Sequence, residues 1–174
     1  ASDWNVLDNG AGMRYALVWY SNTVGTTLQT LIDTNNTSTT SRGVWVACDY
    51  RVANRKLWVY IGNGSGSVVA YQSPTSTITV GEANVLVVRY EEGRSPNEVS
   101  VRLNGSSLVS ANSGASPSAS TATGALCLGT GTITAANFPG TFQMPRALFA
   151  SEYWTDEAVG FLEAKAAADY GITL

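Results

Sequence analysis

The side chains best suited to ligand chemistry gather in one stretch of the chain, residues 44–60. Flat aromatic rings alternate there with side chains that donate or accept hydrogen bonds. Proteins bind sugars with this combination, because sugar rings stack on aromatic faces while sugar hydroxyls bond to Asp, Asn, Arg and Gln. The candidate ligand-binding residues of this stretch are Trp45, Asp49, Tyr50, Arg51, Trp58 and Tyr60.

Alternation along residues 56–62 predicts how two of these rings are presented. Trp58 and Tyr60 fall on one face of an extended strand, and its aliphatic residues fall on the other. Since the aliphatic side is the natural core face, we expect both rings on the exposed or concave face of a sheet. The alternative is that they pack beneath a loop or a helix.

Catalytic groups are scarce in this sequence. It contains no histidine, which excludes His-based zinc sites and nucleophiles that a histidine activates. A glycoside hydrolase needs two carboxyl groups that face each other across a cleft. Glu91, Glu92 and Glu98 flank a turn-like segment and are expected in a solvated loop. Asp33 and Asp49 end strand-like runs and could meet in a cleft, but acids at strand ends usually serve as caps or turn acceptors.

Lyase chemistry uses a tyrosine base beside an arginine, and two pairs of this kind occur. They are Tyr50 with Arg51 and Tyr90 with Arg89, and neither lies in a supporting motif. We therefore predict no catalytic residues and a protein that is not an enzyme. A polysaccharide hydrolase or lyase is the alternative.

No metal site and no cofactor are predicted. Calcium needs carboxylates and carbonyl oxygens crowded around one position, whereas the conceivable contributors Asp3, Asp8 and Asp156 are dispersed. Structural calcium stays open as an alternative. Cys48 and Cys127 lie in apolar runs and are expected as buried thiols, although the sequence alone does not decide whether they form a bridge.

Composition excludes two classes of partner. The 174 residues carry a formal net charge of −3 with scattered basic residues, so no basic stripe is present for nucleic acid. No apolar run approaches the roughly 20 residues of a membrane-spanning helix, so no membrane insertion is expected. The 44% of hydrophobic residues predict a folded protein, which we expect to be a single domain over residues 1–174.

Short runs of β-branched and aromatic residues, separated by Gly, Asn, Ser and Pro, predict an all-β fold. Nine such runs are too many for one open sheet of this size, so two packed antiparallel sheets are expected. The expected strands span Arg14–Tyr20, Thr27–Asp33, Gly43–Tyr50, Lys56–Gly62, Ser67–Gln72, Asn84–Glu91, Glu98–Asn104, Gly124–Gly129 and Gly140–Ala150.

The C-terminal segment changes to a helical period. Thr155 is a good N-cap, the acids that follow it suit the positive end of a helix dipole, and Gly171 supplies the stop. Trp154 and Val159 occupy the two positions of a hydrophobic staple. One face of this helix is expected to carry Val159, Leu162, Ala166 and Tyr170.

Residues 84–174 resemble the laminin-G-like, concanavalin-A-like jelly rolls. The stretch VLVVRYEEGRSPNEVSVRLNGSSL is similar to paired strands of that family, with an Asn104-Gly105 turn. A strand ending in Gly, then Phe138 and Gly140, then a capped helix closed by Tyr170-Gly171 is similar to the family's last elements. The resemblance implies a two-sheet jelly-roll sandwich with one C-terminal helix. It leaves function open, because one such fold hosts many functions.

These observations predict a non-catalytic interaction module. It is expected either to bind glycans in surface adhesion or to serve as a structural component of a virion, such as a bacteriophage head-decoration or fibre protein. The expected partners are carbohydrate or other protein subunits of a larger assembly, including a possible homo-oligomer. The expected location is extracellular or on a virion surface.

Overall fold

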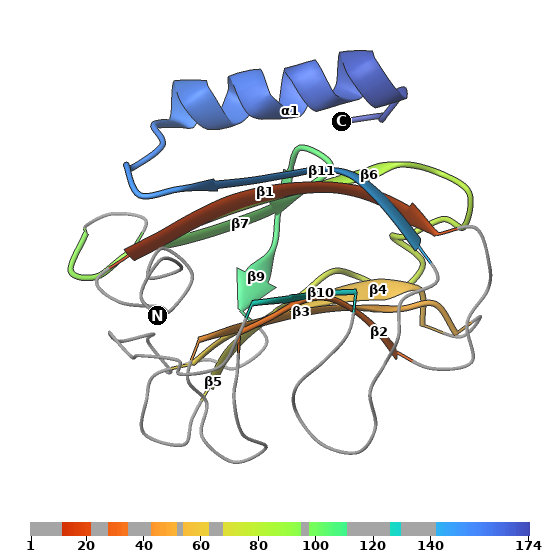
Figure 1. Cartoon of the computed structure of the whole chain (residues 1–174), viewed down its shortest axis with the longest axis horizontal. Helices are drawn as coiled ribbons and strands as arrows, with labels where there is room; N and C mark the ends of the chain where they lie inside the picture. Colours follow the sequence, from red (N-terminus) through yellow and green to blue (C-terminus); the bar gives the residue numbers. More distant parts are fainter. Residues whose placement is uncertain are drawn as a thin grey trace.

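A computed structural model describes residues 12–21, 28–34, 43–51, 54–62, 68–94, 98–110, 126–129 and 142–174. Two antiparallel sheets pack face to face, and one helix lies across the outer side of one of them (Figure 1). The predicted all-β sandwich with a C-terminal helix is confirmed. The expected Phe138 and Gly140, and most of the loops between the strands, fall outside the described residues.

The sheet beneath the helix has five strands in the order β11-β1-β6-β7-β8. Its neighbouring strands are antiparallel throughout. Asn104 and Gly105 connect the last two strands with positive φ angles of 48° and 76°, the conformation that a tight hairpin requires. The strands are β1 (Gly12–Ser21), β6 (Asn84–Glu91), β7 (Val99–Leu103), β8 (Ser106–Ser107) and β11 (Phe142–Ala150).

The second sheet has six strands in the order β10-β2-β3-β4-β5-β9. Each of the nine predicted runs has become a strand, whereas the two-residue strands β8 and β9 were not predicted. The run expected over Gly124–Gly129 shortens to two residues. The strands are β2 (Leu28–Asp33), β3 (Val44–Asp49), β4 (Lys56–Gly62), β5 (Val68–Gln72), β9 (Val109–Ser110) and β10 (Cys127–Leu128).

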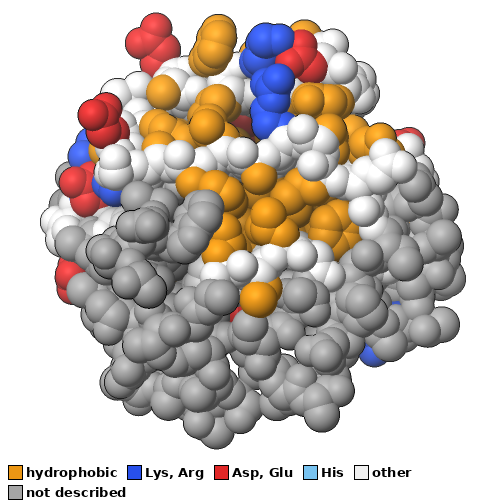
Figure 2. Space-filling model, viewed as in Figure 1, with side chains coloured by type: hydrophobic (Ala, Val, Ile, Leu, Met, Phe, Trp, Pro, Cys, Tyr) orange, Lys and Arg blue, Asp and Glu red, His pale blue; other side chains and the backbone are white. Residues whose placement is uncertain are grey.

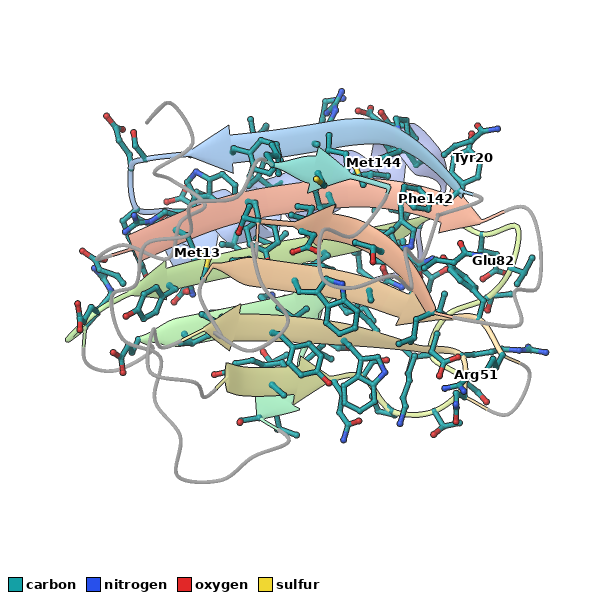
Figure 3. All side chains as sticks on the ribbon, turned by 60° about the horizontal axis from the view of Figure 1, so that its bottom comes forward. Met13, Tyr20, Arg51, Glu82, Phe142 and Met144 are labelled. Carbon is teal, nitrogen blue, oxygen red and sulfur yellow. The ribbon has the colours of Figure 1, made fainter. Side chains whose placement is uncertain are left out.

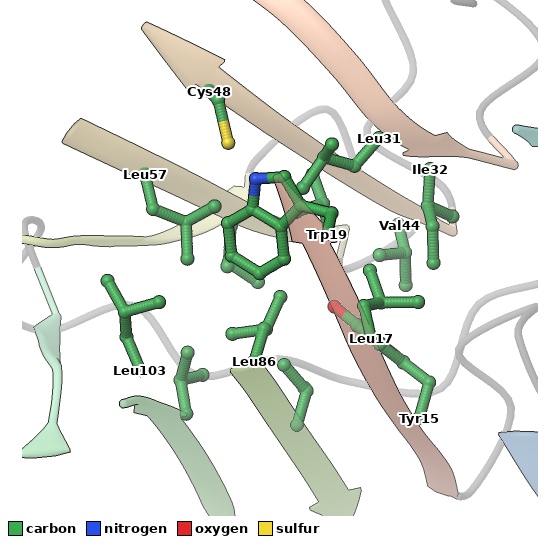
Figure 4. Packing of buried hydrophobic residues seen from close by; sticks show 14 of the residues in the cluster. Tyr15, Leu17, Trp19, Leu31, Ile32, Val44, Cys48, Leu57, Leu86 and Leu103 are labelled. Carbon is green, nitrogen blue, oxygen red and sulfur yellow. The ribbon is translucent and has the colours of Figure 1, made fainter. Parts of the chain in front are cut away.

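The main core fills the space between the two sheets. Trp19 stands at its centre, between Leu57 of one sheet and Leu86 of the other (Figure 4). Its Nε1 donates a hydrogen bond of 2.9 Å to the Tyr50 hydroxyl, so the indole is satisfied without water. Large apolar side chains each contribute about 1.5–3 kcal/mol when they are fully buried. The packing of this core therefore holds the two sheets together face to face.

The two cysteines do not form a disulfide. Cys48 is buried in the core, as the sequence predicted, and burial raises the pKa of its thiol. Cys127 is only half-buried, on the edge strand β10. The described residues include no helix that is both long enough and apolar enough to cross a membrane.

The helix α1 (Asp156–Tyr170) begins and ends where the sequence predicted. The Thr155 hydroxyl accepts a hydrogen bond of 3.2 Å from the Ala158 N–H, and Gly171 closes the helix with a φ of 68°. The helix packs on β1 and β6. The contact between the helix and these strands forms a second apolar cluster, which includes the staple residues Trp154 and Val159. Its buried members are Ala16, Val18, Val85, Val87, Val159, Ala166 and Ile172, and Ala83, Trp154, Leu162, Ala167 and Tyr170 pack against them.

Candidate functional site

Three aromatic rings lie side by side on the outer face of the six-stranded sheet. Trp45 of β3 pairs across the ladder with Tyr60 of β4, and Trp58 lies two residues before Tyr60 on the same strand. The ring centroids of Trp45 and Tyr60 are 5.0 Å apart, and those of Tyr60 and Trp58 are 5.9 Å apart. We call Trp45, Tyr60 and Trp58 the aromatic row. Figure 3 turns this face of the sheet toward the reader.

Strand alternation produces this row. The neighbouring residues Leu57 and Val59 point into the core, so the rings between them must point outward. Opposite Trp58, β3 carries only the small Ala47, which leaves room for the indole. All three rings are half-buried. The expectation that Trp58 and Tyr60 share a face away from the core is thus met by the geometry.

A hydrogen bond holds Trp45 in place, and the Tyr60 hydroxyl can donate to a ligand. The Trp45 Nε1 donates a bond of 3.1 Å to the Thr30 hydroxyl of β2. Partial burial raises the pKa of Tyr60, so its hydroxyl stays protonated and able to donate at neutral pH. A preorganised ring loses little conformational freedom when a ligand stacks on it.

A cation lies at one end of the row. The Lys56 ammonium is 4.7 Å from the centroid of the Trp58 ring. It also donates to the Gln72 side-chain oxygen at 3.4 Å, and Gln72 sits opposite Trp58 on β5. Neither Lys56 nor Gln72 was a candidate at the sequence level. The spacing of Lys56 and Trp58 on one strand face could have suggested the first, whereas the second depends on which strand lies beside β4.

Asp49 and Arg51 come together close to this cation, because Asp49 pairs with Lys56 across the ladder. The buried Asp49 carboxylate accepts bonds from the Arg51 side chain at 2.6 and 2.8 Å, from the Arg51 N–H at 3.1 Å and from Asn54 at 2.7 Å. The bonds from Arg51 lead the causes that hold the pKa of Asp49 below its usual range. Asp49 therefore positions Arg51, whose side chain is 51% exposed.

Tyr50 does not belong to this face, which corrects the sequence-based set. It is fully buried in the core, where its hydroxyl accepts the bond from Trp19. The reason is strand alternation: Tyr50 follows Asp49 by one residue and so points to the same side as Val46 and Cys48. Of the six candidates, the structure brings together Trp45, Trp58 and Tyr60 in the row, with Asp49 and Arg51 beside it.

The strand-end acids considered for hydrolysis, Asp33 and Asp49, are not arranged across a cleft. Asp33 pairs with Trp45 and Asp49 pairs with Leu28, so the two acids lie at opposite ends of the β2–β3 ladder. Both are buried. Glu91 is bound to Arg14 and Arg94, beside the turn after β6.

The tyrosines considered for lyase chemistry are also inside the protein. Tyr50 and Tyr90 are both fully buried in the core, and burial is the main cause that raises the pKa of Tyr90. A buried tyrosine with a raised pKa is a poor surface base. Asp156, the one calcium candidate among the described residues, is paired with Arg89.

Two other surface features, a hollow beside the helix and an apolar patch, are weaker candidates for a binding site. A hollow of about 290 Å³ lies between α1 and the five-stranded sheet, but its charged walls are joined in the pairs Arg89–Asp156 and Arg102–Glu163. Figure 2 shows hydrophobic side chains gathered beneath the helix, on the edge of the sandwich. The strands β11 and β10 supply the exposed Leu148 and Leu128. Neither feature combines neighbouring aromatic rings with available hydrogen-bonding groups.

The sequence matches no protein-family model and no curated protein. Among solved structures, the chain is similar to the CBM40 of the IT-sialidase of Ruminococcus gnavus, with a TM-score of 0.67 and 13% identity over 93% of this chain and 85% of that one. The same CBM40 bound to α2,3-sialyllactose gives a TM-score of 0.65 and 12% identity, with the same coverage.

A leech intramolecular trans-sialidase is also similar, with a TM-score of 0.63 and 16% identity over 90% of this chain and 24% of that one. At such low identities these likenesses establish the fold alone.

Proposed function

We propose that this protein is a non-catalytic carbohydrate-binding module that holds a glycan on the outer face of its six-stranded sheet. The observation that carries the proposal is the aromatic row, in which Trp45, Tyr60 and Trp58 follow one another at 5.0 and 5.9 Å. Sugars bind through C–H groups packed on such rings and through hydroxyls bonded to nearby polar groups. The polar groups here are Lys56, Gln72 and Arg51.

Two further observations support the proposal. Asp33, Asp49, Tyr50 and Tyr90 are buried and Glu91 is engaged in ion pairs, which favours binding over turnover. The solved structures with a similar fold include a CBM40 whose ligands are sialyllactoses, so sialylated glycans belong in the first test. Nothing in the described residues favours a virion component over glycan binding. A glycan-binding role would place the protein outside the cell or on a virion surface.

The test is a glycan array followed by calorimetry with the best ligand. We expect Trp58→Ala to weaken binding by about tenfold or more, because the loss of a stacking ring costs on the order of 1.4 kcal/mol. Tyr60→Ala should act in the same direction. Phe161→Ala is the matched control, since Phe161 is 69% exposed on the helix, away from the six-stranded sheet.

Circular dichroism and thermal melting must show that each variant is folded. The proposal is abandoned if folded Trp58→Ala and Tyr60→Ala proteins bind the ligand as well as the wild type. Steady release of sugar fragments by the wild-type protein would contradict its non-catalytic part.

A further inference from the structure

The charges near the aromatic row differ from the other charges of the described residues. Every other lysine and arginine that the structure describes forms an ion pair with a carboxylate. Arg55 and Lys56 do not, and they are consecutive in the chain. The unpaired positive charge of the described structure is therefore concentrated where β4 begins, two residues before Trp58.

Lys56 has no acid available on its own face. Its cross-strand neighbour is Asp49, but both oxygens of that carboxylate are already taken by Arg51 and Asn54. The one hydrogen bond that the ammonium donates, to Gln72, is long at 3.4 Å. The ammonium remains a cation held over the Trp58 ring, with capacity to donate to a further acceptor.

Arg55 is held in an unusual conformation beside it. Its φ of 42° lies in the left-handed region, which is unfavourable for a non-glycine residue. Backbone bonds of 3.1 Å from Arg55 to Arg51, and from Ile78 to Arg55, keep it there. Its half-buried side chain has a buried Nε with no hydrogen-bond partner. The positive charge of Arg55 thus has no carboxylate partner among the described residues.

We infer that the site is selective for acidic glycans: a sugar ring packs on Trp58 and Tyr60 while its carboxylate or sulfate binds at Lys56, with Arg55 as the flanking cation. This inference rests on the proposed carbohydrate-binding function and specifies the class of ligand. A neutral sugar in the same place leaves both positive charges without a counterion. An acidic sugar supplies the missing acceptor.

The expected size of the effect follows from charge-assisted hydrogen bonds. Such bonds contribute more than neutral ones and are favoured where the groups are partly shielded from water. Selectivity for an acidic glycan over its neutral counterpart should therefore be about tenfold or more. Salt screens the attraction between the opposite charges, so the selectivity should decrease at high ionic strength.

The experiment compares glycans that differ only in the acidic group. Lactose, 3′-sialyllactose and 3′-sulfated lactose are titrated into the protein by calorimetry at low and at high sodium chloride. We expect both acidic ligands, or one of them, to bind at least tenfold more tightly than lactose, with an advantage that shrinks in high salt. The two acidic arms show whether a carboxylate or a sulfate is preferred.

Variants then locate the charge. Lys56→Gln and, separately, Arg55→Gln should reduce affinity for the preferred acidic ligand by about tenfold while leaving lactose binding unchanged. Lys165→Gln is the matched control, because Lys165 is an exposed lysine on the helix that pairs with Asp169. Its affinity for each ligand should equal that of the wild type.

The outcomes separate this inference from the proposed function. If lactose binds as well as both acidic ligands, or if folded Lys56→Gln and Arg55→Gln keep the full selectivity, the inference is wrong. The carbohydrate-binding proposal then survives as long as Trp58→Ala still weakens binding. If neither this set nor a broad array yields a ligand sensitive to Trp58→Ala, both ideas fail.

Discussion

At the scale of single residues, Asp49 shows how a buried charge organises one end of the candidate site. Its carboxylate receives bonds from the backbone and side chain of Arg51 and from Asn54. These donors belong to residues that follow β3, so the carboxylate ties the start of the next loop to the sheet. These hydrogen bonds, those from the Arg51 side chain above all, lower the pKa of Asp49.

Asp49→Asn should destabilise the protein in a pH-dependent way. The folded-state pKa of Asp49 is depressed, so its contribution is present above the unfolded pKa and is lost as pH falls through the folded one. At pH 7 we expect the free energy of unfolding to fall by about 1–2 kcal/mol. The reason is that the NH₂ group of an asparagine would face an N–H donor of Arg51 or Asn54 and could not accept its hydrogen bond. The gap between variant and wild type should begin to narrow below about pH 4 and should close only below the folded-state pKa of Asp49.

Denaturant unfolding of both proteins between pH 7 and pH 2 measures this gap. Asp169→Asn is the control, since Asp169 forms only exposed pairs with Lys165 and Arg146 and should change stability much less than Asp49→Asn does. A gap that stays constant with pH would show that the charge of Asp49 contributes nothing to stability.

At the scale of elements, α1 is attached to the sheet by charge as well as by apolar packing. Glu163 is buried on the face that also carries Val159 and Ala166, and it receives bonds of 2.9 and 3.0 Å from Arg102 of β7. The helical period predicted the apolar members of this face. It gave no sign that a glutamate would be buried among them, because its partner is 61 residues away.

Glu163→Ala should destabilise the protein by about 2–4 kcal/mol, because it leaves the Arg102 guanidinium without its acid on a partly buried face. The replacement of both residues, Arg102→Met with Glu163→Leu, should recover much of the loss. Thermal unfolding measures both effects. If the single variant is as stable as the wild type, the helix is held by apolar packing alone.

The expected helix boundaries were correct for a local reason. Thr155 caps the helix through a residue three positions away, and Gly171 closes it with its own backbone conformation. Such signals act within one turn and can be read from neighbouring letters. The strands β8 and β9 were not expected, since two residues carry too short a pattern.

At the scale of the whole molecule, the sandwich depends on its core and on no covalent cross-link. The core joins both sheets through side chains such as Trp19, Leu57 and Leu86, and both cysteines are free. We therefore expect a reducing agent to leave the melting temperature unchanged within about 1 °C. Melts with and without dithiothreitol measure this, and a clear drop in the reduced sample would contradict it.

The sequence by itself determined the properties that depend on neighbouring residues. Alternation marked the strands and the faces of Trp58 and Tyr60, and the same alternation, applied one residue past Asp49, would have placed Tyr50 in the core. Only the tertiary structure decided which strands lie side by side. It set Trp45 beside Tyr60, brought Gln72 to Lys56 and placed Lys56 opposite Asp49, whose carboxylate Arg51 already binds. Strand order depends on contacts between distant segments, which no local pattern encodes.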